Sequence, residues 1–242
     1  ASDVYKRQDW ICVVDAGNTK VKRGWFRNGR LHEVEVLAQE AWQTPLPQQA
    51  HVVLLASVSL PESTMAQWFK AQGVAEVRVF DAQQELPFES RYTSLNTLGS
   101  DRKLLIAGAN QRHPGLHRLV IGLGSCITYD LIDAAGKHLG GDISPGIYMR
   151  WQAMHQFTAR LPMPNMPKEW PLLGHDTLTA LQAGVLQGVL AEIKGRKAQF
   201  ELILSDLTII LSGGDAHFFE NRLDSPIFAE PNLALYGLHA FY

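Results

Sequence analysis

The fold is decided by the stretch Val13-Val14-Asp15-Ala16-Gly17-Asn18-Thr19-Lys20-Val21-Lys22. A short apolar run, Ile11 to Val14, predicts a strand that leads into Asp15. The apolar pattern resumes at Val21 and continues to Trp25-Phe26, which predicts a second strand leaving a glycine-containing turn. The chain therefore opens with a strand–turn–strand unit.

This opening turn has the residues of an anion-binding loop. Its glycine, backbone N–H groups and threonine hydroxyl can surround an anion. Asp15 can hold a hydrated Mg²⁺ against that anion, because hard cations prefer oxygen ligands, and the lysines add positive charge. The pattern predicts a nucleotide phosphate loop. A plain hairpin with surface lysines is the alternative, and so short a motif does not separate the two.

Composition limits the possible classes of protein. The chain has 242 residues, of which 46% are hydrophobic, as in soluble globular proteins. This length suits one large domain or two of about 100–130 residues. The net charge of -2 and the absence of a basic run give no support to nucleic-acid binding. No apolar stretch approaches the roughly 20 residues of a membrane span and no signal peptide is apparent, so we expect a cytoplasmic protein.

The metal-binding and sulfur-containing residues predict neither a zinc site nor a disulfide framework. Cys12 and Cys126 each lie in an apolar, strand-like run, so we expect both to be small buried hydrophobes. The nine histidines are scattered and form no Cys/His cluster.

The remainder of the first part alternates strands and helices. Asn28-Gly29 is a strong hairpin signal. Residues 1–8 are either a first strand or a tail. Pro114-Gly115 should end the last helix of this part. The patterns predict strands at 30–36, 51–58 and 74–80, and helices at 63–72 and 103–111.

A second apolar run with a glycine-containing turn repeats the opening theme. In it, Gly122-x-Gly124-Ser125 corresponds to Asp15-x-Gly17-x-Thr19. The repeat predicts a duplicated α/β fold, with residues 1–115 and 116–242 as its halves and the ligand in the cleft between them. The alternative is that any two glycine-containing hairpins look alike.

The second half continues with a predicted Gly/Pro turn at 139–146. A buried strand at 207–211 should end on Ser212-Gly213-Gly214-Asp215, where a glycine pair lets the backbone approach a flat ligand closely. Helices are predicted at 147–161, 177–194 and 232–242.

Several motifs, in this order and spacing, resemble those of the type III pantothenate kinases. Each motif is weak alone, whereas the ordered set is specific and covers Val13 to the C-terminus. The motifs are Asp15-x-Gly17-Asn18-Thr19-x-x-Lys22, Thr97-Leu98-Gly99-Ser100-Asp101-Arg102, Gly124-Ser125-x-x-Thr128-x-Asp130, Gly140-Gly141-x-Ile143-x-Pro145-Gly146, Thr158-x-x-Leu161-Pro162, Thr177 before Gly184, and Ser212-Gly213-Gly214-Asp215.

The resemblance implies the fold of the actin-like and sugar-kinase superfamily, in which two ribonuclease-H-like halves surround a nucleotide. It also implies a reaction, in which ATP and pantothenate give 4′-phosphopantothenate and ADP at the start of coenzyme A synthesis. Members of the family are usually homodimers. Another small-molecule kinase of the superfamily, or a non-catalytic ligand-sensing regulator on the same fold, are the competing interpretations.

The resemblance also implies roles for individual residues. Asp101 would accept or orient the hydroxyl proton of pantothenate; its ordinary alternative is a helix N-cap. Asp15 would hold Mg²⁺ through water. The residues implied to bind ATP are Asp15, Gly17, Asn18, Thr19, Lys22, Ser125, Gly213 and Gly214, and those implied to bind pantothenate are Tyr92, Gly99, Ser100, Asp101, Arg102 and Thr177.

Three of the implied pantothenate residues have other interpretations. Arg102 would pair with a polar end of the substrate or brace the site. Tyr92 could equally be a half-buried loop tyrosine, and Thr177 a hydroxyl at a helix start.

One residue departs from the family pattern. The family often has an Asp at the position of Gly122, where it binds a potassium ion, and glycine has no side-chain ligand. The sequence therefore leaves open whether K⁺, NH₄⁺ or no monovalent cation serves here.

Overall fold

The computed structural model describes residues 10–81, 83–223 and 226–242. The prediction for residues 1–8 lies outside this part. The chain divides into two compact units. The first comprises Ala1–Phe88, Ser94–Arg112 and Asn232–Tyr242, and the second comprises Glu89–Thr93 and His113–Pro231.

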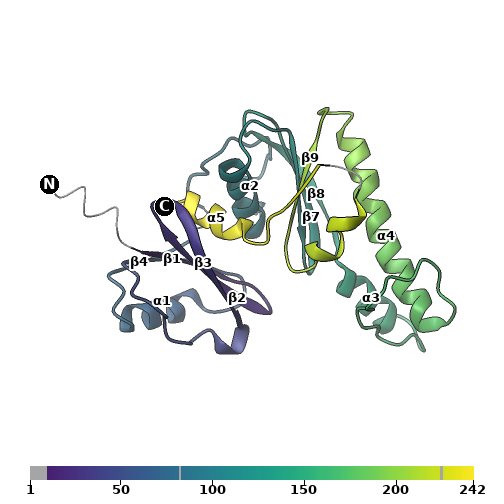
Figure 1. Cartoon of the computed structure of the whole chain (residues 1–242), viewed down its shortest axis with the longest axis horizontal. Helices are drawn as coiled ribbons and strands as arrows, with labels where there is room; N and C mark the ends of the chain where they lie inside the picture. Colours follow the sequence, from purple (N-terminus) through teal and green to yellow (C-terminus); the bar gives the residue numbers. More distant parts are fainter. Residues whose placement is uncertain (1–9, 82, 224–225) are drawn as a thin grey trace. The chain divides into compact units, whose positions relative to one another are not determined.

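The first unit contains a five-stranded sheet with the order β3-β2-β1-β4-β5. Its strands are drawn in purple and blue in Figure 1. β2 pairs antiparallel with β1 and β3, whereas β4 pairs parallel with β1 and β5. Asn28 (φ 52°) and Gly29 (φ 72°) make the predicted hairpin turn in the left-handed region. The strands are β1 (Ile11–Ala16), β2 (Lys20–Arg27), β3 (Arg30–Ala38), β4 (Val52–Ser57) and β5 (Glu76–Val79).

Helices cover both faces of this sheet. They are α1 (Glu62–Ala71), α2 (Ser100–Arg112) and α5 (Leu233–Ala240). Successive side chains of a strand point to opposite faces. Accordingly, Val14 packs with Phe69 of α1, while Val13 packs in a separate core with Leu104 of α2 and Leu235 of α5.

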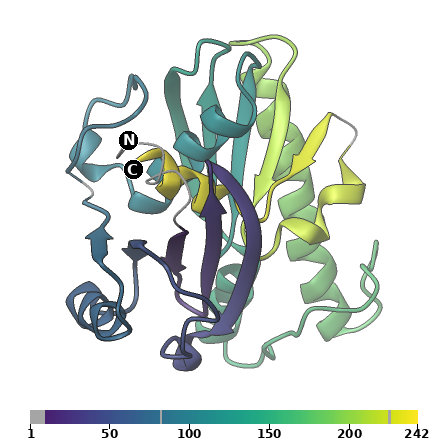
Figure 2. The same ribbon diagram turned by 60° about the vertical axis from the view of Figure 1, so that its left-hand side comes forward.

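The last helix of the chain, α5, packs closely on α2, as Figures 1 and 2 show. A β-carbon on Gly108 would collide with the carbonyl of Leu233, and one on Gly237 with the carbonyl of Leu104. The packing therefore differs from a simple division at residue 115. Residues 232–242 belong to the first unit, and the segment Glu89–Thr93 belongs to the second.

The second unit repeats the first sheet strand by strand. Its order is β10-β9-β6-β7-β8, with β7 antiparallel to β6 and β8, and β9 parallel to β6 and β10. This identity of order and direction confirms the predicted duplicated α/β fold. The strands are β6 (Arg118–Leu123), β7 (Cys126–Ile132), β8 (His138–Pro145), β9 (Thr208–Ser212) and β10 (Ile227–Ala229).

Two elements of the second unit differ from prediction. The expected turn at 139–146 is wrong, because these residues form most of β8 and pair along β7. Helix α3 (Ile147–Gln156) ends five residues before the predicted Leu161, whereas α4 (Thr177–Phe200) begins where predicted. Short 3₁₀ helices occupy Gln39–Ala41, Leu95–Thr97, Ala216–Phe218 and Glu220–Arg222.

Candidate active site

The first loop is a tight turn between β1 and β2. The amide of Gly17 donates to the carbonyl of Lys20 at 3.0 Å and closes the turn. Asn18 and Thr19 lie at the exposed tip. Because the Gly17 amide is used within the turn, the tip residues are the ones free to meet a ligand.

A serine that the sequence analysis did not single out braces this loop. Ser59 Oγ donates to the carbonyl of Gly17 at 2.8 Å, and Gln39 Nε2 donates to Ser59 Oγ at 2.8 Å. Ser59 follows β4 and carries no motif, so only the parallel pairing of β4 with β1 reveals its role.

Asp15 and Lys22 lie directly opposite each other on β1 and β2. Burial raises the pKa of the Asp15 carboxyl, Lys22 lowers it in part, and Asp101 raises it further. Burial also lowers the pKa of Lys22, which Asp15 partly restores. The charge of Asp101 thus reaches Asp15, which relates the start of α2 to the end of β1 within the first unit.

The carboxylate of Asp101, at the start of α2, lies against the backbone of Gly99. Its Oδ1 atom lies 2.5 Å from the position that a β-carbon on residue 99 would take. The helix begins at Ser100, so Asp101 lies within its first turn rather than at the N-cap position. Arg102 is 2% exposed, which favours its alternative role as a brace over direct contact with a solvent-borne ligand.

The second loop, between β6 and β7, is enclosed by glycines. The amide of Gly146 donates to the carbonyl of Ser125 at 3.0 Å, and a β-carbon there would collide with the loop backbone. A β-carbon on Gly213, which has φ 98°, would likewise collide with the carbonyl of Leu123, whereas one on Gly214 would meet open space. Ser125 itself is exposed.

Cys126 is exposed, so the prediction that it is buried is wrong. It is the first residue of β7, directly after the second loop, and the apolar run becomes buried only from Ile127 onward. Cys12, in the middle of the first sheet, is buried as predicted.

The position of Gly122 in the second unit matches that of Asp15 in the first. Each is the penultimate residue of the central strand of its sheet. Gly122 lies between Thr128 and Ser212 on the neighbouring strands. Thr128 Oγ1 is buried and has no hydrogen-bond partner among the described residues. An oxygen beside Gly122 is therefore available to a ligand.

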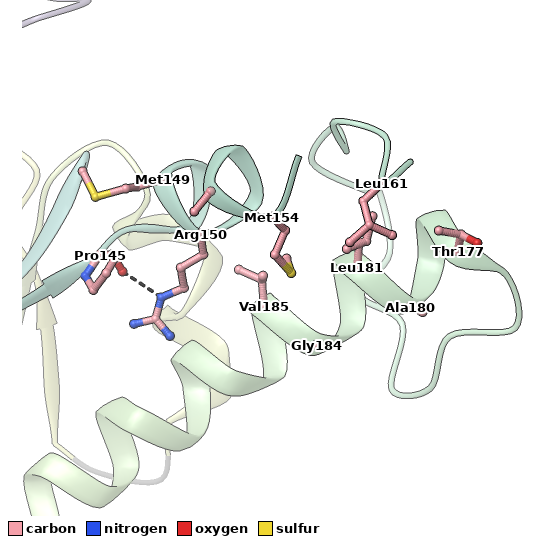
Figure 3. Close-up of a pocket in the computed structure, with 11 residues that line it drawn as sticks. Pro145, Met149, Arg150, Met154, Leu161, Thr177, Ala180, Leu181, Gly184 and Val185 are labelled. Carbon is pink, nitrogen blue, oxygen red and sulfur yellow. Dashed lines mark hydrogen bonds between the residues drawn. The ribbon is translucent and has the colours of Figure 1, made fainter. Parts of the chain in front are cut away.

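Thr177 lies at the wall of a pocket between α3 and α4, with a volume of about 840 Å³ (Figure 3). Asp176, not Thr177, caps α4, because its carboxylate accepts the Thr179 amide at 2.8 Å. The lining is mostly apolar and consists of Pro145, Met149, Arg150, Ala153, Met154, Leu161, Thr177, Ala180, Leu181, Gly184 and Val185.

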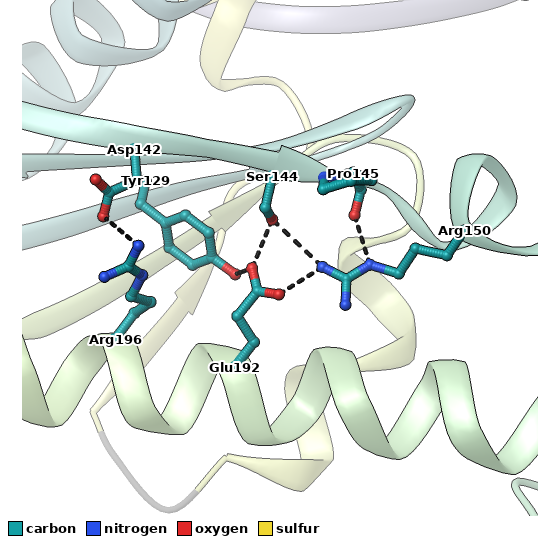
Figure 4. Close-up of polar contacts among 7 residues, drawn as sticks. All are labelled: Tyr129, Asp142, Ser144, Pro145, Arg150, Glu192 and Arg196. Atoms are coloured by element: carbon teal, nitrogen blue, oxygen red, sulfur yellow. Dashed lines mark hydrogen bonds and ion pairs between the residues drawn. The ribbon is translucent and has the colours of Figure 1, made fainter. Parts of the chain in front are cut away.

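A polar cluster fixes Arg150 at one end of this pocket (Figure 4). The carboxylate of Glu192 accepts hydrogen bonds from Tyr129 Oη at 2.8 Å, Ser144 Oγ at 2.5 Å and Arg150 Nη2 at 2.5 Å. Burial alone would raise the pKa of Glu192, but these three donors lower it on balance. The cluster ties α4 to β7, β8 and α3.

Tyr92 is half-buried and lies in the segment Glu89–Thr93, which belongs to the second unit. Its ring stacks on His138, with 6.1 Å between ring centroids and an interplanar angle of 22°.

The structure thus gathers the candidate residues into groups within each unit. The first unit holds Asp15, Gly17, Asn18, Thr19 and Lys22 together with Gly99, Ser100, Asp101 and Arg102. In the second unit, Gly122, Ser125, Gly213 and Gly214 surround the second loop, while Tyr92 and Thr177 lie on other elements.

No three His, Cys, Asp or Glu side chains of the described residues form a group that could hold a metal ion. Among the same residues, no helix is long and apolar enough to cross a bilayer.

Comparison with known proteins identifies the family. The type III pantothenate kinase family model matches residues 11–199. The curated type III pantothenate kinase of Flavobacterium johnsoniae is 35% identical over 238 residues, covering 96% of this chain and 97% of the relative. That of Christiangramia forsetii is 36% identical over 235 residues, covering 94% and 95%. The chain belongs to the type III pantothenate kinase family.

Solved structures similar to this type III pantothenate kinase family member support its fold. A Campylobacter jejuni protein assigned to the Baf family of transcriptional activators is 21% identical, with a TM-score of 0.60 over 94% of this chain and 95% of that chain. A Listeria monocytogenes protein assigned as an N-acetylmannosamine kinase is 12% identical, with a TM-score of 0.50 over 96% and 98%. At these identities the likeness concerns the fold alone.

Proposed function

We propose that this protein transfers the γ-phosphoryl group of ATP to pantothenate, giving 4′-phosphopantothenate and ADP. Membership of the family supports the reaction. The observation that supports it for this chain is the pairing of Asp15 opposite Lys22, directly before an exposed turn suited to phosphates. The reaction would be the first step of coenzyme A synthesis, and we infer that it takes place in the cytoplasm.

We assign the phosphates of ATP to the first loop. The exposed residues Asn18 and Thr19 offer an amide and a hydroxyl at its tip, and Lys22 supplies positive charge beside Asp15. Gly17 keeps the turn tight enough for the phosphates to approach. In the second unit, Ser125 offers a hydroxyl, and Gly213 with Gly214 offers backbone for the adenosine.

Mg²⁺ fits the chemistry of Asp15. A carboxylate whose charge is poorly solvated gains from a nearby cation, and Mg²⁺ keeps several waters while binding one or two carboxylates and phosphates. Asp15 would hold the ion through water. When bound, the ion would neutralise charge on the phosphates.

Asp101 is the group that we assign to the chemistry. Phosphoryl transfer to an alcohol requires chiefly that the hydroxyl be placed in line with the γ-phosphorus. The exposed carboxylate of Asp101 accepts or orients the hydroxyl proton. We assign pantothenate to Gly99 and Ser100, with Arg102 as a brace beside them in the first unit, and to Tyr92 and Thr177 of the second unit.

We assign a monovalent-cation position to the surroundings of Gly122. Gly122 lacks a side chain, but the unpaired Thr128 hydroxyl beside it is a ligand of the kind that K⁺ or NH₄⁺ accepts. A requirement for either ion would show as activation by KCl or NH₄Cl over NaCl at constant ionic strength.

We also propose a homodimer. Large apolar side chains of α3, of α4 and of the segment between them are exposed, and such side chains are candidates for an interface. Phe157 is 83% exposed and Leu172 is 85% exposed. Others in these elements are Tyr148, Met149, Leu173 and Leu178. Sedimentation of the purified chain should give a dimer, and Leu172→Asp should shift it to monomer.

The deciding experiment measures ADP release with pantothenate and then with a panel of sugars. Turnover should depend on pantothenate in the presence of Mg²⁺ and either K⁺ or NH₄⁺. Asp101→Asn should lower turnover by about 10²-fold or more. Asp81→Asn, which changes an exposed carboxylate elsewhere in the first unit, should leave it unchanged. Sugar-dependent turnover, or full activity of Asp101→Asn, would refute the assignment.

A further inference from the structure

The segment that carries Tyr92 is held to the second sheet by a chain of hydrogen bonds. His138 Nε2 lies 3.0 Å from Asp130 Oδ1, and both side chains are fully buried. His138 Nδ1 lies 2.8 Å from Ser90 Oγ. Ser90 Oγ in turn accepts the Tyr92 amide at 3.1 Å. A buried carboxylate is thereby connected to the backbone of Tyr92 through two side chains.

One tautomer of the His138 imidazole satisfies every hydrogen bond in this series. With the proton on Nε2, His138 donates to Asp130, and its Nδ1 accepts from the Ser90 hydroxyl. The Ser90 oxygen is then free to accept the Tyr92 amide. The bonds all run in one direction, from the Tyr92 amide to Ser90, from Ser90 to His138 and from His138 to Asp130, so each member orients the next.

His138 also contacts the ring of Tyr92 and the backbone of Glu89 and Arg91. Its imidazole stacks against the phenol of Tyr92 with a centroid separation of 6.1 Å, within the usual range for aromatic pairs. Its carbonyl accepts the Arg91 amide at 2.8 Å, and its amide donates to the Glu89 carbonyl at 2.9 Å. The main chain and the side chain of Tyr92 are therefore positioned from one residue of β8.

An exposed ion pair on the same segment provides a contrast. Lys137 Nζ lies 2.7 Å from Glu89 Oε2, and the Glu89 side chain is 79% exposed. Exposed ion pairs of this kind contribute little to stability, because solvent screens the charges and both long side chains lose conformational freedom. The buried hydrogen bonds from Asp130 to Ser90, rather than this ion pair, hold the Tyr92 segment to the second sheet.

We propose that Asp130, His138 and Ser90 are positioning residues that fix Tyr92 and thereby set the affinity for pantothenate. The inference rests on the proposed function, in which Tyr92 contacts that substrate. The three residues act through Tyr92, so they affect the binding of pantothenate while leaving phosphoryl transfer and ATP binding intact.

The first test is steady-state kinetics of Ser90→Ala. Loss of one hydrogen bond to the Tyr92 backbone should raise KM for pantothenate by about threefold to tenfold. Both kcat and KM for ATP should stay within about twofold. His138→Gln retains a donor towards Asp130 but removes the acceptor for Ser90, and should give the same pattern. Glu89→Gln, which removes only the exposed pair, should match the wild type.

A double-mutant cycle separates positioning from general structural damage. In a Tyr92→Ala background, Ser90→Ala should cause no further rise in KM for pantothenate, because its effect passes through the missing ring. An equal rise in both backgrounds, or an unchanged KM in Ser90→Ala alone, would overturn the inference.

Hydrogen exchange of the ligand-free protein provides a readout that does not depend on turnover. The Tyr92 amide should exchange faster in Ser90→Ala than in the wild type, while the Arg91 amide, which bonds to the His138 carbonyl, should change less. If the wild type shows no turnover with pantothenate, the proposed function fails. Exchange at Tyr92 then still decides the positioning, and unchanged protection there would refute it.

Discussion

The Oδ1 atom of Asp101 occupies space beside Gly99 that a β-carbon on residue 99 would need, at a separation of 2.5 Å. Real β-carbons are essentially never found that close to another heavy atom. The absence of a side chain at Gly99 is therefore a condition for the orientation of the Asp101 carboxylate.

Gly99→Ala should consequently displace that carboxylate while leaving the fold intact. We expect kcat to fall by about 10-fold to 10²-fold, because small misplacements of a reacting group are costly. The melting temperature should barely change, since Asp101 is exposed and can move away. Gly195→Ala, at an open position on α4, is the matched control. A kcat equal to the wild type would show that the carboxylate orientation is immaterial.

Two adjacent glycines after β9 should respond differently to alanine. Gly213 has φ 98° and lies against the carbonyl of Leu123, so Gly213→Ala should destabilise the protein by at least about 2 kcal/mol in chemical denaturation. Gly214 is open, so Gly214→Ala should unfold like the wild type and alter only KM for ATP. Equal stability of the two variants would contradict the close packing of Gly213.

Replacement of Asp15 should stabilise the protein at neutral pH while abolishing turnover. Burial raises the pKa of this carboxyl in the folded state. The folded state therefore binds the proton more tightly than the unfolded chain, and stability falls as pH rises from the unfolded pKa through the folded one. Asn cannot ionise, so the variant does not lose this stability as pH rises.

The measurement is the free energy of unfolding of Asp15→Asn and wild type from pH 3 to pH 8. The variant should be the more stable one at pH 7, and the difference should vanish below the unfolded pKa of about 3.9. A variant that is less stable at pH 7 would indicate that attraction to Lys22 outweighs the cost of burial.

The two thiols should differ sharply in reactivity. Burial raises the pKa of Cys12 to about 12, whereas Cys126 is exposed beside the second loop. Because the thiolate is the reactive form, iodoacetamide should modify Cys126 alone in the folded protein and both residues in guanidinium chloride. Mass spectrometry of the modified peptides provides the check.

ATP should slow the modification of Cys126 if Ser125 contacts the nucleotide as proposed. Cys126→Ser should retain activity and resist iodoacetamide. Rapid labelling of Cys12 in the folded protein would contradict its burial, and labelling of Cys126 at an unchanged rate under saturating ATP would count against a nucleotide at this loop.

Much of the fold follows from hydrophobic periodicity. The runs ending at Val14 and Ile121 are apolar because β1 and β6 are central strands covered on both faces. The weak likeness of the two hairpins predicts the duplication, which the identical strand orders confirm. The helix beginning at Thr177 is equally clear from its period.

The errors have physical causes. Glycines and a proline in residues 139–146 suggest a turn, but pairing with β7 outweighs their low strand propensity. The three residues of β10 are too few to give a pattern. Cys126 falls at the boundary between loop and strand, where an apolar run says nothing about exposure.

The site is predictable only where its residues are close in sequence. Asp15 and Lys22 belong to one hairpin, so the opening motif identifies both. The Ser59 brace and the chain from Asp130 to Ser90 depend on which strands become neighbours. A single sequence does not specify which strands become neighbours.

The return of α5 to the first unit has a consequence for synthesis. When a ribosome has completed residues 1–112, the helix that fills the surface beside Leu104 has not yet been made. The nascent first sheet has α2 alone on one apolar face, which stays incompletely covered until α5 has emerged after the second unit. Chaperone engagement during translation should therefore persist until α5 has left the exit tunnel.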